Sequence, residues 1–204
     1  MLVTIEGIDG AGKSTLAKGL AAALRAEGVD VELLREPGGV ELSERVRALV
    51  KDPALTVDPR AEALLYAAAR AQLVAERVRP LLDAGRWVLL DRFVDSSLAY
   101  QGAGRGLGVG AVRAINDFGT GGLAPARTLL LRIDPAAGRA RAEGRGEATD
   151  RLEAEGEGFF ATIARSYDEM AAAEPERFRV LDATLEPERL VGEALRALAD
   201  LRSM

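Results

Sequence analysis

The chain has 204 residues, of which 48% are hydrophobic and 29% are charged, and its net charge is −5. This composition is typical of one globular domain with a buried core, and the acidic balance argues against binding to a nucleic acid polymer or an anionic membrane. No apolar run approaches ~18 residues and the chain does not start with a basic segment. We therefore expect a cytoplasmic protein with neither a membrane span nor a secretory signal.

The chain contains no cysteine and no histidine. Their absence excludes disulfides, thiolate nucleophiles, zinc sites built from these residues, and catalytic triads that use histidine. Any chemistry must therefore come from carboxylates, hydroxyls, lysine and arginine. Lysine is scarce and arginine abundant, so Lys13, which lies inside a glycine-rich loop, is more informative than a single arginine.

The first half of the chain alternates short apolar runs with segments of helical periodicity. In chain order, we predict a strand over 2–5, a helix over 15–26, a strand over 29–34, helices over 40–50 and 60–82, and a strand over 87–91. The last of these, "WVLLD", is continuously apolar until its final residue, as in a strand that is buried on both faces.

In the second half, a polar and glycine-rich stretch over 96–110 precedes predicted strands over 128–134 and 177–183, and an amphipathic helix over 185–201 ends the chain. Strands that alternate with helices indicate an α/β fold: a doubly wound parallel sheet of about five strands flanked by helices. We expect a single domain over 1–204, with ligands at the carboxyl ends of the strands.

The segment "GIDGAGKST" matches the phosphate-binding pattern GxxxxGK[ST], with the required strand before it and helix after it. The glycines allow consecutive backbone N–H groups to turn inward around a phosphate chain. Lys13 would reach the β- and γ-phosphates, and Ser14 would bind Mg²⁺. The predicted ATP-binding residues are Gly7, Ile8, Asp9, Gly10, Ala11, Gly12, Lys13, Ser14 and Thr15. A plain turn between strand and helix is the alternative.

Asp91 and Arg92 follow directly from the apolar strand over 87–91. A carboxylate at that position holds Mg²⁺ in phosphate-loop proteins, so Asp91 is the second predicted metal residue beside Ser14. Arg92 would be a cationic clamp on a transferred phosphoryl group. The alternatives are a turn that begins with an aspartate and an arginine that only forms a structural ion pair.

The loop by itself is compatible with several nucleotide-dependent proteins. A GTPase needs an Asn-Lys-x-Asp segment to read guanine, and the chain has none. An ATPase switch that hydrolyses ATP without a small acceptor remains open at this point.

The segments "IEGIDGAGKST", "REPGG", "DRFVDSSLAYQGAGRG", "TLLLRID" and "DRLE" together resemble the bacterial thymidylate kinase family of phosphate-loop nucleoside monophosphate kinases. The resemblance implies phosphoryl transfer from MgATP to dTMP, giving dTDP and ADP in dTTP biosynthesis. The alternatives are a kinase for another nucleotide or nucleoside and, less favoured, the ATPase switch.

The resemblance also implies how the chain binds dTMP. Asp9 would accept a hydrogen bond from the deoxyribose 3′-OH, Arg47 and Arg92 would bind the phosphate, and Tyr66 would stack on thymine where the family usually has phenylalanine. By the same resemblance, Arg70 would donate to thymine O4, Ser97 and Gln101 would contact the base edge, and Tyr100 would exclude a 2′-OH. The alternatives are that Tyr66 is a core residue in an apolar helix and that Ser97, Tyr100 and Gln101 are surface loop residues.

The charged stretch over 139–158 occupies the position of the family's mobile lid, and Arg151 in "DRLE" would reach the phosphates as an arginine finger. Arg145 and Arg141 are second choices. Some family members carry an arginine in the loop at the position of Gly10, so here the lid must supply that charge. The predicted catalytic residues are Lys13, Arg92 and Arg151.

Two further expectations concern assembly and the donor base. Family members are homodimers, and Ala67, Ala68, Ala69 and Ala71 would allow close helix approach, although a helix buried within one chain would look the same. Adenine would lie near Ala183 or Thr184, after the last strand. No partner beyond a second copy and the small molecules dTMP and ATP is expected.

Overall fold

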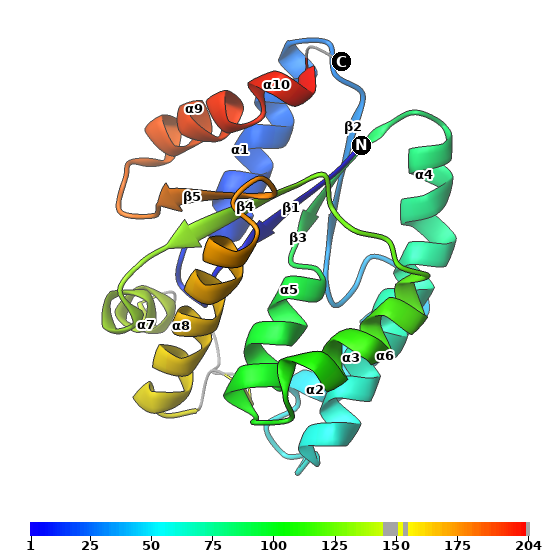
Figure 1. Cartoon of the computed structure of the whole chain (residues 1–204), viewed down its shortest axis with the longest axis vertical. Coiled ribbons are helices and arrows are strands. Elements are labelled where there is room, and N and C mark those ends of the chain that lie inside the picture. The colour runs from blue at the N-terminus through cyan, green and yellow to red at the C-terminus, as the bar shows by residue number, and fades with distance from the viewer. Residues whose placement is uncertain (145–150, 153–154, 203–204) are drawn as a thin grey trace.

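The computed structural model describes residues 1–144, 151–152 and 155–202. Its centre is a five-stranded sheet in the order β2-β3-β1-β4-β5 (Figure 1). The strands are β1 (Leu2–Glu6), β2 (Val31–Arg35), β3 (Trp87–Asp91), β4 (Arg127–Arg132) and β5 (Phe178–Asp182). Every pairing is parallel, so all the strands end at one edge of the sheet. This confirms the predicted fold class.

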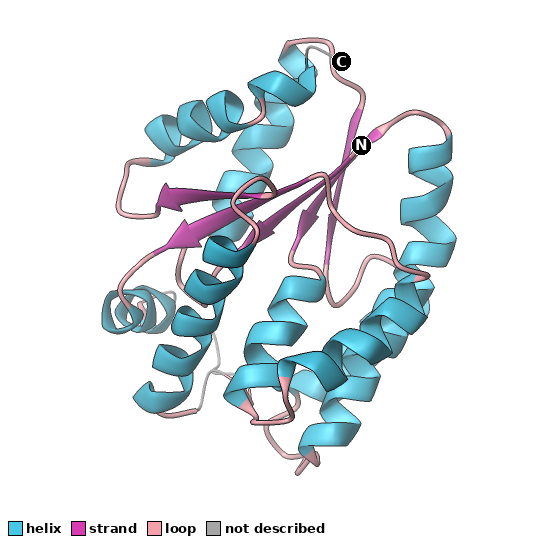
Figure 2. Cartoon of the chain, viewed as in Figure 1, coloured by secondary structure: helices cyan, strands magenta, loops and turns pink. Residues whose placement is uncertain are grey.

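Helices lie on both faces of the sheet, as the secondary-structure colouring shows (Figure 2). They are α1 (Lys13–Ala26), α2 (Glu41–Lys51), α3 (Pro59–Leu73), α4 (Arg79–Asp83), α5 (Val94–Ser97), α6 (Val109–Thr120), α7 (Pro135–Glu143), α8 (Glu157–Ala173), α9 (Pro187–Ala197) and α10 (Ala199–Arg202), with π-helical turns at η1 (Val74–Val78) and η2 (Leu98–Gly104). Helices α1 and α9 cover one face, and α5, η2 and α8 cover the other. None of the described helices is long and apolar enough to cross a membrane.

Most predicted elements are present with shifts of a few residues. The long helix predicted over 60–82 is the continuous run α3-η1-α4. No helix is predicted over 109–120 or 159–173, yet α6 and α8 occupy them. In α6, two glycines and several β-branched residues weaken the intrinsic preference for helix, and packing against α3 overrides it. Within the glycine-rich stretch, residues 98–104 form η2 rather than a loop.

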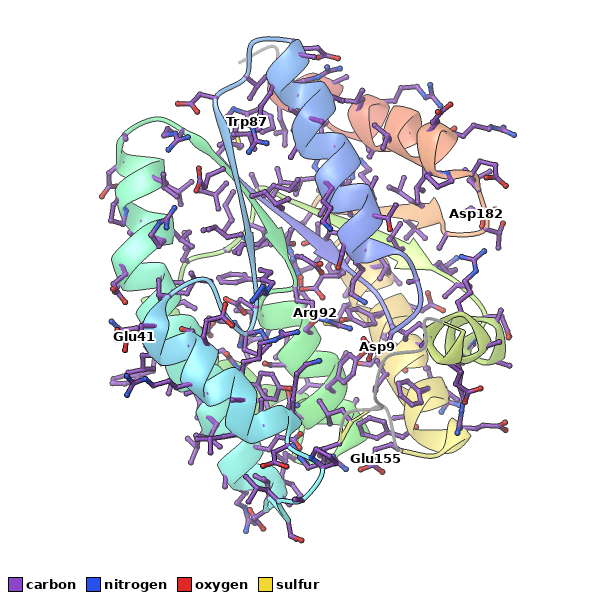
Figure 3. All side chains as sticks on the ribbon, turned by 180° about the vertical axis from the view of Figure 1, so that it is seen from behind. Asp9, Glu41, Trp87, Arg92, Glu155 and Asp182 are labelled. Atoms are coloured by element: carbon purple, nitrogen blue, oxygen red, sulfur yellow. The ribbon has the colours of Figure 1, made fainter. Side chains whose placement is uncertain are left out.

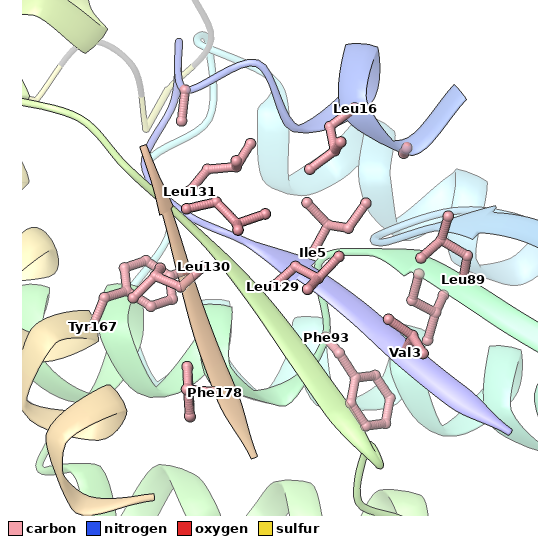
Figure 4. Packing of buried hydrophobic residues seen from close by; sticks show 14 of the residues in the cluster. Val3, Ile5, Leu16, Leu89, Phe93, Leu129, Leu130, Leu131, Tyr167 and Phe178 are labelled. Atoms are coloured by element: carbon pink, nitrogen blue, oxygen red, sulfur yellow. The ribbon is translucent and has the colours of Figure 1, made fainter. Parts of the chain in front are cut away.

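The core explains the apolar strands. Ile5, Leu89 and Leu129 are at most 1% exposed because helices cover both faces of the sheet (Figure 4). In the register of β1 with β3, Ile5 lies opposite Asp91. The loop after β1 and the turn after β3 therefore leave the sheet side by side, and the fold places the two predicted phosphate-binding segments next to each other.

Candidate active site

The phosphate loop has the backbone that its glycines predict. Gly7, Gly10 and Gly12 have φ angles of 140°, 80° and 90°, a region that other L-residues rarely adopt. Gly12 caps the N-terminus of α1, so the free N–H groups of the first turn point into the loop. Lys13 Nζ donates to the Ile8 carbonyl at 2.7 Å. Burial and the neighbouring Arg92 lower the pKa of Lys13 to about 8, against the opposing effect of Asp9.

Ser14 and Asp91 meet where the start of α1 faces the end of β3. The Ser14 hydroxyl donates to Asp91 Oδ2 at 2.6 Å. A hydroxyl and a carboxylate directed at one point are oxygen donors of the kind that Mg²⁺ prefers, and Mg²⁺ commonly takes its remaining ligands from phosphates and water. The donor set therefore fits the predicted metal.

Asp9 and Arg92 form an ion pair between the loop and the turn after β3 (Figure 3). Arg92 Nη2 donates to Asp9 Oδ1 at 2.5 Å, and the Tyr100 hydroxyl donates to Asp9 Oδ2 at 2.9 Å. Burial acts to raise the pKa of Asp9, but Arg92, Lys13 and the Tyr100 hydrogen bond outweigh it and hold that pKa well below its usual value. Asp9 is therefore an ionised acceptor inside an anion-binding loop.

Arg70 is the centre of a second buried polar group, and 2% of it is exposed. Its Nε donates to Glu36 at 2.7 Å, its Nη1 to Ser97 at 2.9 Å and also to Asn116, and its Nη2 to the Phe93 carbonyl at 3.0 Å. Burial raises the pKa of Glu36 to about 6 although Arg70 opposes the shift. Sequence reasoning missed Glu36 and Asn116, although Glu36 lies in the quoted "REPGG".

These groups surround one cavity of about 540 Å³. Most predicted site residues line it: Asp9, Gly10, Gly12, Lys13, Ser14, Thr15, Arg47, Tyr66, Arg70, Asp91, Arg92, Ser97, Tyr100 and Gln101. Its lining also includes residues without a predicted role, namely Lys18, Arg35, Glu36, Pro37, Lys51, Ser96 and Leu152. Gly7, Ile8 and Ala11 are buried in the loop and do not line the cavity.

The arginines predicted to act from the lid differ in whether they line the cavity. Arg151 does not line the cavity; it donates to Glu62 Oε2 at 2.5 Å and to the Val50 carbonyl at 3.1 Å. Arg141 of α7, a second choice, does line it and donates to the Ala183 carbonyl at 2.8 Å. Arg145 lies outside the described residues, as does part of the predicted lid.

Glu62 is a further residue that sequence reasoning missed. It is fully buried and also accepts from Gln101 and Arg105, at 2.9 and 3.3 Å. A lone acid in an alanine-rich helix, four residues before Tyr66, is the signal that was available.

Gly10 packs directly against the backbone of α7. A Cβ atom on Gly10 would lie 1.8 Å from the Gly138 carbonyl oxygen, and a Cβ on Gly138 would lie 3.0 Å from the Asp9 carbonyl. Two glycines thus bring α7 onto the loop, which places Arg141 over the cavity. The close approach also explains why an arginine is not accommodated at Gly10 in this arrangement.

Comparison with known proteins gives one family. The family model described as Thymidylate kinase matches residues 5–194. The thymidylate kinase of Deinococcus radiodurans is 49% identical over 200 residues, which is 98% of this chain and 97% of the relative. That of Halorhodospira halophila is 47% identical over 204 residues, covering 98% and 94% of the two chains. The crystal structure of thymidylate kinase from Ehrlichia chaffeensis superposes with a TM-score of 0.80 at 28% identity, covering 98% of each chain.

We predict that Gly10→Ala weakens the binding of a non-hydrolysable ATP analogue by at least about tenfold, because the new methyl group forces α7 away from the loop. Isothermal titration calorimetry measures the affinity. The matched control is Gly158→Ala in α8, where an added Cβ meets no atom within 4 Å. Equal affinity of the Gly10 variant and the control would show that the close approach has no role in binding.

Proposed function

The chain belongs to the thymidylate kinase family, and we propose that it transfers the γ-phosphoryl group of MgATP to dTMP, giving dTDP and ADP. The observation that carries the proposal is that one cavity joins the phosphate loop to the buried polar group around Arg70. A cavity of this kind holds a donor and an acceptor together and excludes water from the transfer. We also propose a cytoplasmic location, where both nucleotides are available.

On the donor side, the loop N–H groups and Lys13 would bind the phosphates of ATP, and Ser14 and Asp91 would hold Mg²⁺. When bound, the ion neutralises charge on the phosphate oxygens. Arg141 lies against Ala183, so we propose adenine near Ala183 and Thr184, at the carboxyl end of β5.

On the acceptor side, Arg92 and Arg47 would bind the dTMP phosphate. Asp9 keeps the capacity to accept a bond from the 3′-OH, because an ionised carboxylate has about four acceptor positions and Arg92, Tyr100 and the nearby Lys13 do not occupy all of them. Tyr100 stands beside Asp9, where its ring would crowd a 2′-OH and thereby select deoxyribose.

For the base, Tyr66 would stack on thymine and Arg70 would donate to its O4. Of the five N–H donors of a guanidinium, those of Arg70 make four hydrogen bonds to described residues, which leaves one N–H of Nη2 for the base. A fixed donor favours the keto oxygen of thymine over the amino group of cytosine. Ser97 and Gln101 would complete the base edge.

Phosphoryl transfer needs no protein nucleophile, since its loose transition state is stabilised by positioned cations. Lys13 and Arg92 would supply two of these cations. Arg151 is the proposed arginine finger. It would leave its ion pair with Glu62 and bind the phosphates instead. Arg105 would stay paired with Glu62 and balance its charge.

We further propose that two copies associate through α3 and α6. Ala67 and Ala71 pack within the chain, next to Gly119 of α6, whereas Ala68 is exposed. The outward faces of both helices are apolar at helical spacing: Ala61, Leu64 and Ala68 on α3, and Ala111, Ala114 and Phe118 on α6. Phe118 is 92% exposed and Leu64 is 58% exposed. Two adjacent apolar stripes of this kind are typical of a subunit interface.

The proposed reaction is tested by ADP release from ATP alone and from ATP with each of dTMP, dUMP, dCMP and thymidine. We expect strong stimulation by dTMP, weaker stimulation by dUMP and almost none by the others. Stimulation mainly by another acceptor would assign a different kinase, and acceptor-independent release would indicate an ATPase switch.

We expect Arg92→Ala to lower kcat by at least about 10²- to 10³-fold, because it removes a cation that meets the developing charge. Steady-state kinetics give kcat, and circular dichroism checks the fold. The control is Arg86→Ala, which removes an arginine paired with Asp30 at the other end of β3. Near-full turnover of the Arg92 variant would remove this residue from the catalytic set.

We expect Phe118→Asp to convert the proposed dimer into a monomer, because a charge would lie on the apolar stripe of α6. Sedimentation velocity measures the mass. The control is Val180→Asp on β5, also at an exposed apolar residue. A monomeric parent protein, or a variant that stays dimeric, would contradict the proposed interface.

A further inference from the structure

Glu6 is a buried carboxylate that the proposed reaction does not use. It is the last residue of β1, has no exposed surface and does not line the cavity. Three neutral groups donate to it: the Phe93 N–H to Oε1 at 2.7 Å, and the hydroxyls of Ser96 and Tyr167 to Oε2 at 2.6 and 2.8 Å. Burying a carboxylate without a direct cationic partner costs free energy, which indicates that Glu6 has a specific role.

The backbone beside Glu6 is strained at Arg92. Arg92 has a φ of 72°, and it is the non-glycine residue with positive φ in the described part of the chain. This left-handed conformation is unfavourable for an L-residue and persists only where its surroundings enforce it. The enforcing bonds come from the end of β1: the Arg92 N–H donates to the Ile5 carbonyl at 3.0 Å, and the next N–H, of Phe93, donates to Glu6.

The side chain of Arg92 is connected to the same carboxylate. Arg92 Nη1 donates to Ser96 Oγ at 3.0 Å, and Ser96 donates its single proton to Glu6. Because an ionised carboxylate only accepts, Glu6 directs the serine proton away from Arg92 and leaves a serine lone pair facing the guanidinium. Tyr167 fixes the far side of this arrangement, since its hydroxyl contacts both Glu6 and Ser96.

We infer that Glu6 is a positioning residue for Arg92: its carboxylate holds the turn after β3 and, through Ser96, orients the guanidinium toward Gly7 and Asp9 before a phosphate arrives. The inference rests on the proposed function for what Arg92 does. Such preorganisation means that Arg92 need not reorient as the phosphoryl group moves.

Several charged and titratable groups lie near Glu6. Lys13 of α1 and Arg92 of the turn favour its ionised form, Asp95 of α5 opposes it, and Arg177 pairs with Asp95 at 2.6 Å. Burial and Asp95 raise the pKa of Glu6 to about 7, against the lowering effects of Ser96, Arg92 and Tyr167. A positioning role requires the ionised form, so assays belong at about pH 8, above that pKa.

The test is a double-mutant cycle with Glu6→Gln, Arg92→Ala and the double variant, assayed for dTMP-dependent ADP release. We expect Glu6→Gln alone to lower kcat by about ten- to a hundredfold, with KM for ATP within about twofold. In the Arg92→Ala background we expect less than about a twofold further loss, because the group that Glu6 positions is gone. Losses that multiply, or an unchanged kcat in Glu6→Gln, would overturn the inference.

Two variants guard against a simple folding defect. Ser96→Ala removes the hydroxyl that links Glu6 to the Arg92 guanidinium and keeps the hydrogen bond from the Phe93 N–H to Glu6. We expect this variant to lose part of its kcat, and to lose little more when it is combined with Arg92→Ala. Glu32→Gln makes the same chemical change on β2, at a residue paired with Arg77, and should leave kcat unchanged. A loss in Ser96→Ala that multiplies with that of Arg92→Ala would count against the inference even if Glu6→Gln fails to fold.

A measurement that does not depend on enzyme turnover tests this inference independently of the proposed function. Carbon-13 NMR of the Glu6 carboxyl group follows its titration, and Arg92→Ala should raise the pKa above about 7 because a neighbouring cation is removed. If dTMP does not stimulate the parent protein, the proposed function fails while this shift still demonstrates the coupling. An unchanged pKa in Arg92→Ala would overturn the coupling itself.

Discussion

The contact between Asp9 and Arg92 is the interaction on which the site depends. It joins the loop after β1 to the turn after β3, and it exists because Ile5, the second-last residue of β1, lies opposite Asp91, the last residue of the adjacent strand β3. Both side chains are partly buried, and without Arg92 the Asp9 carboxylate would keep only Lys13, at 3.9 Å, as a cationic partner. The pair therefore keeps the donor and acceptor halves of the cavity at a fixed separation, which in-line transfer between two nucleotides requires.

The same pair explains why a carboxylate is tolerated in a loop built for phosphate. Arg92 and Lys13 both favour the ionised form of Asp9, while Lys13 is held by the Ile8 carbonyl and has a pKa lowered to about 8. Phosphate oxygens would bring negative charge to both cations and restore the full charge of the lysine. In the proposed function the acid faces the acceptor and the lysine faces the donor, so one nine-residue segment would bind both substrates.

Different sides of helix α3 carry different groups of residues because of its helical periodicity. Glu62, Tyr66 and Arg70 follow one another at intervals of four residues, which places them on one side of the helix. That side faces the cavity and the network around Gln101. Leu64 and Ala68 lie on a different side, which is apolar and exposed. The proposed base recognition and the proposed subunit interface thus use opposite sides of the same helix, which packs against α6.

The sequence alone determined the fold class and the phosphate loop, because these follow from local signals: alternating elements, glycines in the loop, Lys13 and Ser14 at the start of a helix, and Asp91 and Arg92 at the end of a strand. The rest of the predicted cavity lining came from the family resemblance. Tertiary structure decided what depends on contacts between distant segments. Local spacing does not show that Arg151 meets Glu62, 89 positions away, while Arg141 reaches the cavity. Nor does it show that Glu36 and Asn116 hold Arg70, or that Gly10 meets Gly138. Such partners become neighbours only when the sheet and its helices pack, so their physical roles are properties of the fold.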